Sequence, residues 1–312
     1  MNYKKNIIEY FRIEGFTAPR FLKNTDGEGT VIIAAFPVRI PREKSGSGLR
    51  IAPFAAANHY REAVNRLKKI SLLLREQTGL TKKDIRLFCN STLEEKRFAS
   101  LAGLGFIGRN SLIITKEWGS RIILAGMILP FHLEEDTPLE NGSIAGALCG
   151  SCRRCMKACP TGAIERSGEI NRDKCLQSLT TDSRVIPEWI MEKWGNRLYG
   201  CTICQDCCPF NKSVESPEPD GITGDVNGPL SFESVLAVDD STLKENLKGT
   251  ALGMSWITAE NLKRNALISA SFCRDSQEAA GRIPIVESYT GHPVIAYAAI
   301  WSLKRLKKKA GQ

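Results

Sequence analysis

Nine of the eleven cysteines lie between residues 149 and 208, and this clustering restricts what the chain can fold into more than any other feature. A large chain with clustered cysteines binds metal more often than it forms disulfides. The same stretch is interrupted by Pro and Gly and contains little continuous apolar sequence. We therefore expect bound metal, and not a large hydrophobic core, to hold residues 146–211 together.

The first four of these cysteines follow the pattern C-x2-C-x2-C-x3-C-P, which is the bacterial ferredoxin run. In two-cluster ferredoxins the first three thiolates of the run bind one [4Fe–4S] cube, and the fourth binds the other cube. The second cube then needs three more cysteines, and the first needs one from a later Cys-Pro pair. The first predicted cube is bound by Cys149, Cys152, Cys155 and Cys208. The second is bound by Cys159, Cys175, Cys201 and Cys204.

The stretch GCTICQDCCPFN (200–211) ends in two adjacent cysteines, of which only one completes the pattern. Cys208 follows Cys204 at the required spacing and directly precedes Pro209, so Cys207 is predicted to be an unligated thiol. Because C-x2-C pairs also form tetrahedral zinc sites, two zinc sites are the alternative. Two adjacent low-potential clusters would carry single electrons, so we expect the chemistry itself to lie in another domain.

The first 145 residues alternate helical and strand patterns and predict an α/β domain. Residues 58–77 carry apolar side chains at helical spacing. Short branched-aliphatic runs predict buried strands at 31–38, 85–89, 111–115 and 121–129.

The C-terminal part predicts a linker followed by helices. Residues 212–229 are rich in turn formers, and 230–312 contain two helical patterns, at 259–272 and 292–306. Two helices bury little by themselves, so this small helical-repeat cap must dock on the rest of the molecule. The predicted domains are 1–145, 146–211, the linker 212–229, and 230–312.

The formal net charge of +9 favours an anionic partner such as nucleic acid or a phosphorylated cofactor. Part of the excess lies in the tail LKRLKKKAGQ, for which a solvated helix end is the alternative explanation. The start MNYKKNIIEYFRIEGF has no apolar signal core, and no run approaches the roughly 18 apolar residues of a membrane span. We expect a cytoplasmic protein without a membrane association.

Several stretches together make the chain resemble the epoxyqueuosine reductase family, cobalamin-dependent iron–sulfur enzymes related to reductive dehalogenases. The matching stretches are AGLGFIGRNSLII (102–114), CGSCRRCMKACPTGAI (149–164), CLQSLT (175–180), IPEWIMEKWGNRLYGCTICQDCCPFN (186–211) and KRNAL (263–267). The resemblance implies a nitroreductase-like α/β domain that holds a base-off corrinoid, two cubes that feed it electrons, and C-terminal repeats that help to hold tRNA. The implied reaction removes the epoxide oxygen of epoxyqueuosine at the tRNA wobble position. The implied electron donor is a low-potential carrier such as ferredoxin or flavodoxin.

The resemblance also assigns residues to the cobalamin. The implied corrinoid-binding residues are Phe54, Tyr60, Gly103, Gly105, Asn110, Ser111, Ile113, Thr115, Ser178 and Thr180. For the two glycines, a tight turn is an equally good explanation. None of the three histidines stands in a D-x-H-x-x-G context, so the sequence indicates no axial histidine and the base-off state is expected.

The sequence differs from the family at the position of the family's catalytic acid, an aspartate. Counting thirteen residues back from Ala102, where the family has an aspartate, leads to Cys89, next to Asn90. A thiol with an ordinary pKa near 8.5 is a possible proton donor, whereas a small buried hydrophobe at a strand end is the alternative. Pro53 and Phe54 likewise replace an arginine and a tyrosine. We therefore take Cys89 and Asn90 as candidate catalytic residues.

Three hypotheses follow from these matches and departures. The first is an epoxyqueuosine reductase with an altered acid. The second is a paralogue that keeps the corrinoid and the clusters but reduces another substrate or reactivates a corrinoid protein. The third is an electron-transfer protein without catalysis, whose α/β domain is a docking module.

Overall fold

Strand β2 (Thr30–Pro37) is buried along its whole length. Successive side chains of a strand point to opposite faces of the sheet. Ile32 and Phe36 accordingly lie in one hydrophobic core, whereas Ile33 lies in a second one. This strand therefore has no polar face, because its sheet is covered on both sides. The computed structural model in which it lies describes residues 3–25, 27–38, 48–212, 224, 226 and 230–311.

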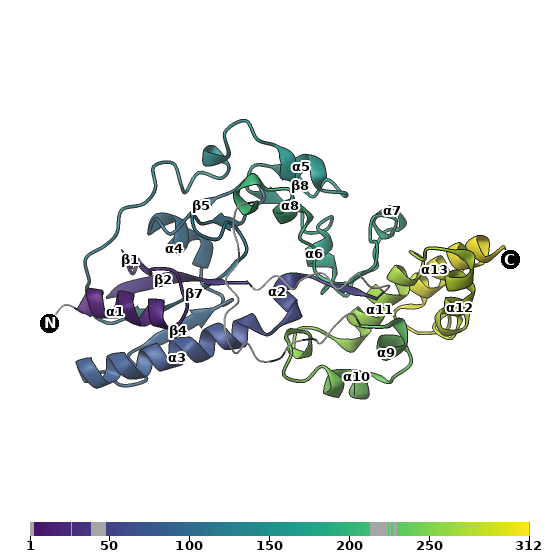
Figure 1. Cartoon of the computed structure of the whole chain (residues 1–312), viewed down its shortest axis with the longest axis horizontal. Helices are drawn as coiled ribbons and strands as arrows, with labels where there is room; N and C mark the ends of the chain where they lie inside the picture. The colour runs from purple at the N-terminus through teal and green to yellow at the C-terminus, as the bar shows by residue number, and fades with distance from the viewer. Residues whose placement is uncertain are drawn as a thin grey trace.

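The sheet around β2 is four-stranded and antiparallel, in the order β1-β2-β7-β4. Helices cover both of its faces (Figure 1): one face packs against α1 and α3, the other against α4. This mixed arrangement confirms the class expected for the N-terminal part. The elements are β1 (Arg20–Lys23), β7 (Ile122–Leu129), β4 (Arg86–Cys89), α1 (Tyr3–Ile13), α3 (His59–Thr78) and α4 (Glu95–Leu101).

The helix predicted at 58–77 is α3, and both of its ends have a local cause. The Asn58 side chain accepts a hydrogen bond from the Arg61 N–H, and Gly79 ends the helix with a φ of 73°. The strand predicted at 111–115 is wrong in its length. Only Ile113–Ile114 (β6) is a strand, paired with Phe106–Ile107 (β5). Ser111 has a φ of 63°, which a strand does not permit.

Residues 146–211 form a module of short elements. Its last strand pairs in parallel with β3, which belongs to the N-terminal part and precedes α2. The two parts therefore share a backbone ladder. The elements are η1 (Ala147–Cys149), α5 (Arg154–Ala158), β8 (Ile164–Arg166), β9 (Glu169–Ile170), α6 (Leu176–Leu179), α7 (Glu188–Met191), β10 (Arg197–Tyr199), α8 (Ile203–Asp206), η2 (Pro209–Asn211), β3 (Arg50–Ile51) and α2 (Pro53–Ala56).

The described C-terminal residues are helical. The two predicted helices are α11 and α13, and α12 lies between them with Pro284 in its interior. The sequence did not predict α12 because Gly281 and Pro284 interrupt its pattern. The predicted linker lies almost wholly outside the described residues. The elements are α9 (Phe232–Leu236), α10 (Asp240–Asn246), η3 (Ala251–Gly253), α11 (Ala259–Ala270), α12 (Ser276–Glu287) and α13 (Ala296–Ala310).

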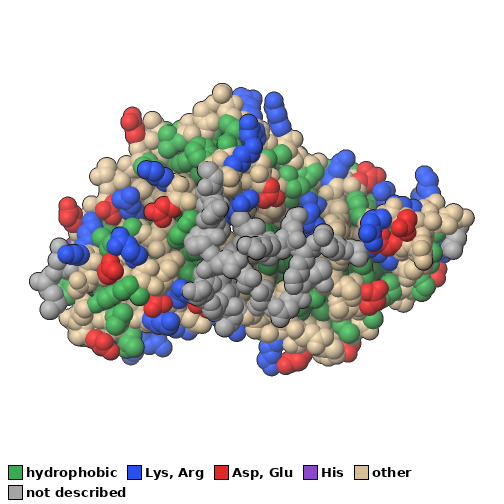
Figure 2. All heavy atoms as spheres, viewed as in Figure 1, with side chains coloured by type: hydrophobic (Ala, Val, Ile, Leu, Met, Phe, Trp, Pro, Cys, Tyr) green, Lys and Arg blue, Asp and Glu red, His purple; other side chains and the backbone are tan. Residues whose placement is uncertain are grey.

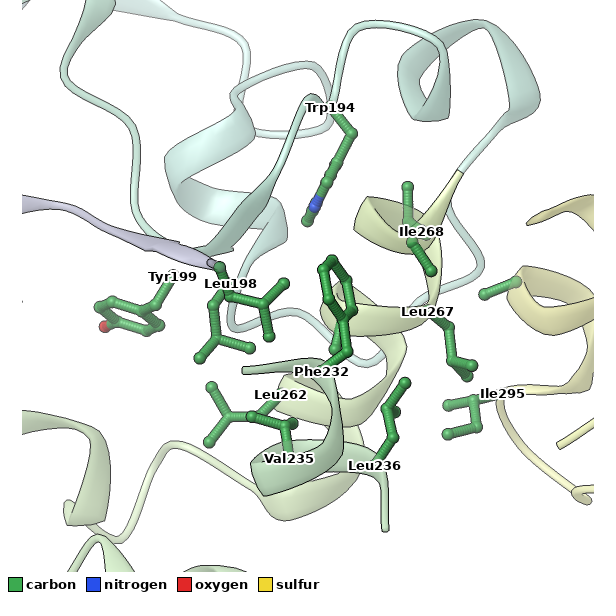
Figure 3. Close-up of a cluster of buried hydrophobic side chains, with 14 of the residues drawn as sticks. Trp194, Leu198, Tyr199, Phe232, Val235, Leu236, Leu262, Leu267, Ile268 and Ile295 are labelled. Atoms are coloured by element: carbon green, nitrogen blue, oxygen red, sulfur yellow. The ribbon is translucent and has the colours of Figure 1, made fainter. Parts of the chain in front are cut away.

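One hydrophobic core joins these helices to the cysteine-rich module (Figure 3). Trp194 and Leu198 of the module are fully buried against Phe232 and Leu262 of the C-terminal helices. The expectation that residues 146–211 lack a large core is therefore wrong for their second half. This core could not be predicted from the sequence, because its apolar residues lie on elements of three or four residues, which are too short to show helical or strand periodicity.

Buried polar residues of α11 also bind the module. Asn265 Nδ2 donates to the carbonyl oxygens of Thr180 at 2.9 Å and Leu198 at 2.8 Å. Arg264 donates to the Leu179 carbonyl at 2.6 Å and to that of Asp182. These side chains satisfy carbonyls of the chain between Cys175 and Cys201, so α11 positions the backbone that carries both cysteines.

Candidate active site

The first predicted cysteine group includes Cys155, which lies on α5. Cys149 and Cys208 lie in one small hydrophobic cluster. Burial, followed by the neighbouring Cys149 and Cys152 thiols, raises the pKa of Cys208. Burial also raises the pKa of Cys155 to about 11, with Cys207 as the largest contribution from a thiol, followed by Cys149 and Cys208. The four thiols therefore lie near one another, and Cys207 lies beside them.

The second predicted group is equally close. Burial, then Cys201 and Cys159, raises the pKa of Cys175. Burial, then Cys201, Cys175 and Cys155, raises the pKa of Cys204 to about 12. Cys155 belongs to the first group, so the two groups adjoin. Within the residues that the structure describes, no set of three or more His, Cys, Asp or Glu side chains is arranged around one metal ion.

Two contacts tie the first group to the α/β domain. Arg109 Nε donates to the Cys152 carbonyl at 2.9 Å, and its Nη2 donates to the Gly150 carbonyl at 2.6 Å. At the other end of the module, Asn211 Oδ1 accepts from the Ser120 N–H at 2.8 Å. The cysteine module is thus fixed to loops of the α/β domain at both ends.

A cavity of about 810 Å³ lies where the α/β domain, the cysteine module and the segment after α10 meet. All four cysteines of the second group line it, whereas none of the first group does. The cavity is therefore separate from the first group and open to the second.

Five of the ten residues assigned to the corrinoid line this cavity, and five do not. Those that line it are Phe54, Tyr60, Asn110, Ser111 and Ser178, together with the candidate catalytic residue Asn90. Cys89, Gly103, Gly105, Ile113, Thr115 and Thr180 are not among the lining residues.

Local packing accounts for several of the residues outside the lining. A Cβ on Gly103 would lie 2.4 Å from the Thr137 carbonyl oxygen, and one on Gly105 would lie 2.6 Å from that of Ile114. Thr115 Oγ1 donates to the Gly119 carbonyl. Thr180 Oγ1 donates to the Gln177 carbonyl. The close approach that the glycines permit is therefore to the chain's own backbone, which favours the turn explanation.

Asn110 presents a polar group to the second cysteine group. Its Nδ2 atom is buried and has no hydrogen-bond partner among the described residues. Its amide nevertheless lies near enough to lower the pKa of Cys204. The Ala163 N–H also donates to Cys159 Sγ, at 3.3 Å. Donors directed at thiolates are a common feature of iron–sulfur sites, so these residues fit a [4Fe–4S] cube.

Two lining residues have unusual backbone conformations. Asn90 and Ser111 have φ values of 51° and 63°. The Glu95 carboxylate holds the first turn, since it accepts from the N–H groups of Asn90 at 3.2 Å and Ser91 at 2.8 Å. Lys96 Nζ holds the second by donating to the Ser111 carbonyl at 3.1 Å. Such conformations persist where surrounding contacts enforce them, and they concentrate at functional sites.

Three titratable groups lie near the turn that contains Asn90: those of Cys89, Tyr60 and Glu95. Burial, followed by Glu95, raises the pKa of Cys89. Burial is also the main cause that raises the pKa of Tyr60, with Tyr199, Cys89 and Glu95 adding to it. Burial raises the pKa of Glu95, although hydrogen bonds from Ser91 and Asn90 oppose the change. The neutral forms of all three groups are therefore favoured.

Sequence reasoning missed several lining residues. Lys96 and Arg172 both line the cavity, and burial followed by Arg172 lowers the pKa of Lys96. Trp256 contributes a wall from the C-terminal part and is 49% exposed. No local motif marks these residues, because they come from separate segments that only the fold brings together. All three histidines are described, and none lines the cavity.

Comparison with known proteins agrees with this arrangement. Residues 148–211 match the family model described as a 4Fe-4S double cluster binding domain. The fold and the site thus define an iron–sulfur protein whose double-cluster domain faces a cavity of an α/β domain.

Relatives identify the family. The chain is 30% identical over 303 residues to the epoxyqueuosine reductase of Bacillus subtilis, which covers 94% of this chain and 75% of that protein. It is 32% identical over 231 residues to that of Prochlorococcus marinus, covering 72% of each chain. The chain belongs to the epoxyqueuosine reductase family and is an oxidoreductase.

Solved structures share the fold. The epoxyqueuosine reductase of Streptococcus thermophilus has a TM-score of 0.81 at 24% identity, covering 99% of this chain and 91% of that one. An epoxyqueuosine reductase solved with a tRNA-Tyr epoxyqueuosine-modified stem loop has a TM-score of 0.74 at 24% identity, covering 97% and 90%. Within the described residues, no helix has the length and apolar character needed to cross a bilayer.

Proposed function

We propose that this chain reduces epoxyqueuosine in tRNA to queuosine. The overall reaction consumes two electrons and two protons, breaks both C–O bonds of the epoxide, forms one C=C bond and releases one water. The observation that carries the proposal is that all four cysteines of the second group line the 810 Å³ cavity. A cluster bound by this group would therefore be next to any molecule that the cavity binds, and could transfer electrons to it. The family and the relative solved with a modified tRNA stem loop indicate the substrate.

Base-off cobalamin is the proposed cofactor of the cavity. The volume is at the upper end of small-molecule sites, ~300–1,000 Å³, and five of the residues assigned to the corrinoid line it. When bound, the corrinoid supplies a strongly reducing centre that no side chain provides. With no histidine in the lining, the chain offers no imidazole as a lower ligand. As in the family that the chain belongs to, the α/β domain that would hold the cobalamin is proposed to be nitroreductase-like.

Cations and the C-terminal helices are proposed to hold the tRNA. Lys96 and Arg172 place two positive charges at the cavity wall, where a phosphate would be stabilised. Lys304 and Lys308 are exposed on α13, the last helix of the proposed helical-repeat cap. A tRNA substrate also fits a cytoplasmic location.

Protonation of the departing oxygen is proposed to involve the turn after β4. Cys89 occupies the position of the family's acid, but its raised pKa makes it a weak donor at neutral pH. Asn90 lines the cavity and Glu95 holds its turn, so this carboxyl group, whose pKa is also raised, is the alternative proton source. The second candidate function, reduction of another substrate, is favoured by the same departure and by Phe54, which lines the cavity where the family has a tyrosine.

Anaerobic loading with iron, sulfide and cob(II)alamin tests the cofactor assignment. We expect retention of cobalamin on gel filtration and a base-off electron paramagnetic resonance signal. Leu112→Trp fills the cavity and should abolish retention, whereas Leu139→Trp, on an exposed residue outside it, should not. A nitrogen-coordinated cobalt signal, or equal retention by both variants, would contradict the proposal.

A further inference from the structure

Basic side chains gather beside the first cysteine group. Arg153, Arg154, Lys157 and Lys212 are all exposed, and none of them forms a salt bridge to a described residue. Figure 2 shows Lys and Arg side chains along the top edge of the molecule, near which Figure 1 places α5. We call Arg153, Arg154, Lys157 and Lys212 the α5 surface.

The α5 surface borders an open hollow of about 450 Å³. Arg154, Lys157 and Lys212 line it, together with Ala158 and Cys207. Among the described residues, the carboxylate that raises the pKa of Cys207 is that of Asp206, and it lies 3.7 Å from the Arg121 guanidinium. The hollow is therefore positive and has a thiol of the cysteine module in its wall.

Exposed apolar side chains stand on the same module. Leu148, directly before Cys149, is 41% exposed, and Phe210, two residues after Cys208, is 42% exposed. Weak electron-transfer complexes use small interfaces, commonly below ~1,200 Å², and electrostatic attraction guides their encounter. Positive charge with a few apolar residues is what an acidic carrier would contact.

The hollow and the cavity are distinct spaces that border different cysteine groups. They share no lining residue: the cavity has the second group in its wall, and the hollow has Cys207 beside the first group. A large substrate in the cavity would cover the second group. Electrons must then enter from the first group, whose surface is the α5 surface.

We propose that the α5 surface is the docking site of an acidic, low-potential one-electron carrier protein. This inference rests on the proposed function. In each encounter one reduced carrier is oxidised and the chain gains one electron. Two encounters supply the two electrons that one epoxide consumes, together with two protons from solvent, and one water leaves.

The test compares Arg154→Glu/Lys157→Glu with the control Lys82→Glu/Lys83→Glu, which makes the same change in net charge at an exposed turn of the α/β domain. The probe is an acidic plant-type [2Fe–2S] ferredoxin. Its Kd for the cluster-loaded protein and the rate at which it reduces that protein are both measured without tRNA, from 50 to 500 mM salt. Iron content is checked first in each variant.

We expect the α5 double variant to raise the Kd and to slow reduction by about tenfold or more at low salt, and to flatten the salt dependence. Its reduction by dithionite and its Kd for tRNA should equal those of the control. Equal ferredoxin Kd values in both variants would overturn the proposal. So would a raised Kd for tRNA with unchanged ferredoxin binding, which would assign the α5 surface to tRNA. Because neither carrier measurement needs turnover, failure of the epoxide reaction alone would count only against the proposed function.

Discussion

Replacing Asn265 by Ala should destabilise the fold and loosen the second cysteine group. Asn265 is fully buried in α11. Its Nδ2 donates to two carbonyls, at 2.9 and 2.8 Å, and its Oδ1 accepts from Arg264 Nη2 at 2.8 Å. Alanine removes these partners from a site that is fully buried.

The size of the effect follows from these groups. Each buried carbonyl without a partner costs about 1–3 kcal/mol, and a hydrogen bond from a charged guanidinium contributes about as much. Three such contributions, each near the lower end of this range, give about 4 kcal/mol. Asn261, on the same helix, donates a single side-chain bond to the Thr181 carbonyl at 2.9 Å. Its replacement by Ala should cost only about 1 kcal/mol and serves as the matched control.

Anaerobic urea titration of cluster-loaded protein, followed by far-ultraviolet circular dichroism, measures both variants. With a slope of about 3 kcal/mol per M urea, Asn265→Ala should lower the midpoint by about 1 M and Asn261→Ala by less than about 0.5 M. Iron release should begin at lower urea in the first variant. Equal midpoints for the two variants would refute the idea that the polar residues of α11 hold this segment.

Other predictions concern the cysteines and the surface charge. Cluster-loaded protein should contain about eight irons; Cys208→Ser should lose iron while Cys207→Ser should not, and equal loss would reverse the assignment of the adjacent pair. Cys89→Asp should raise epoxyqueuosine turnover and Cys89→Ala should change it less than about tenfold, whereas loss of strong wild-type turnover in Cys89→Ala would make the thiol the acid. Burial raises the pKa of Cys89 in the folded chain, so as pH rises this thiol ionises in the unfolded chain before it does in the folded one, and the free energy of unfolding should fall above about pH 8.5. Cys89→Ala should lessen that fall. An unchanged urea midpoint between pH 8 and 10 would contradict the raised pKa. Lys304→Gln/Lys308→Gln should flatten the salt dependence of tRNA binding, a better test than truncating α13, because truncation would remove the fully buried Leu306.

The proximity of the cysteines could be predicted because it follows from their spacing along the chain, whereas their division into two sets of cluster ligands stays a prediction. The run from Cys149 to Cys159 lies on one loop and one short helix, so distance along the chain nearly determines distance in space. The buried strand β2 was found for a similar reason, since eight successive apolar residues have few alternatives. Which of Cys207 and Cys208 binds iron stays a prediction, because both lie beside the first group.

The cavity could be predicted only in part. Phe54, Asn110 and Ser178 were found through a resemblance, and no periodicity indicates them. Arg172 and Trp256 were missed because they reach the cavity from a turn and from the C-terminal part. Their positions depend on the core that residues 176–199 share with the C-terminal helices, and that core has no sequence period.

Mass spectrometry of tRNA nucleosides after an anaerobic single turnover tests whether this chain reduces epoxyqueuosine. The protein is loaded with iron, sulfide and cobalamin, reduced, and mixed with epoxyqueuosine-containing tRNA. We expect the modified nucleoside to lose one oxygen atom, and we expect omission of cobalamin or of reductant to prevent the loss. Leu112→Trp should prevent it, whereas Leu139→Trp should not. An unchanged nucleoside in a preparation that retains about eight irons and bound cobalamin would contradict the proposed function.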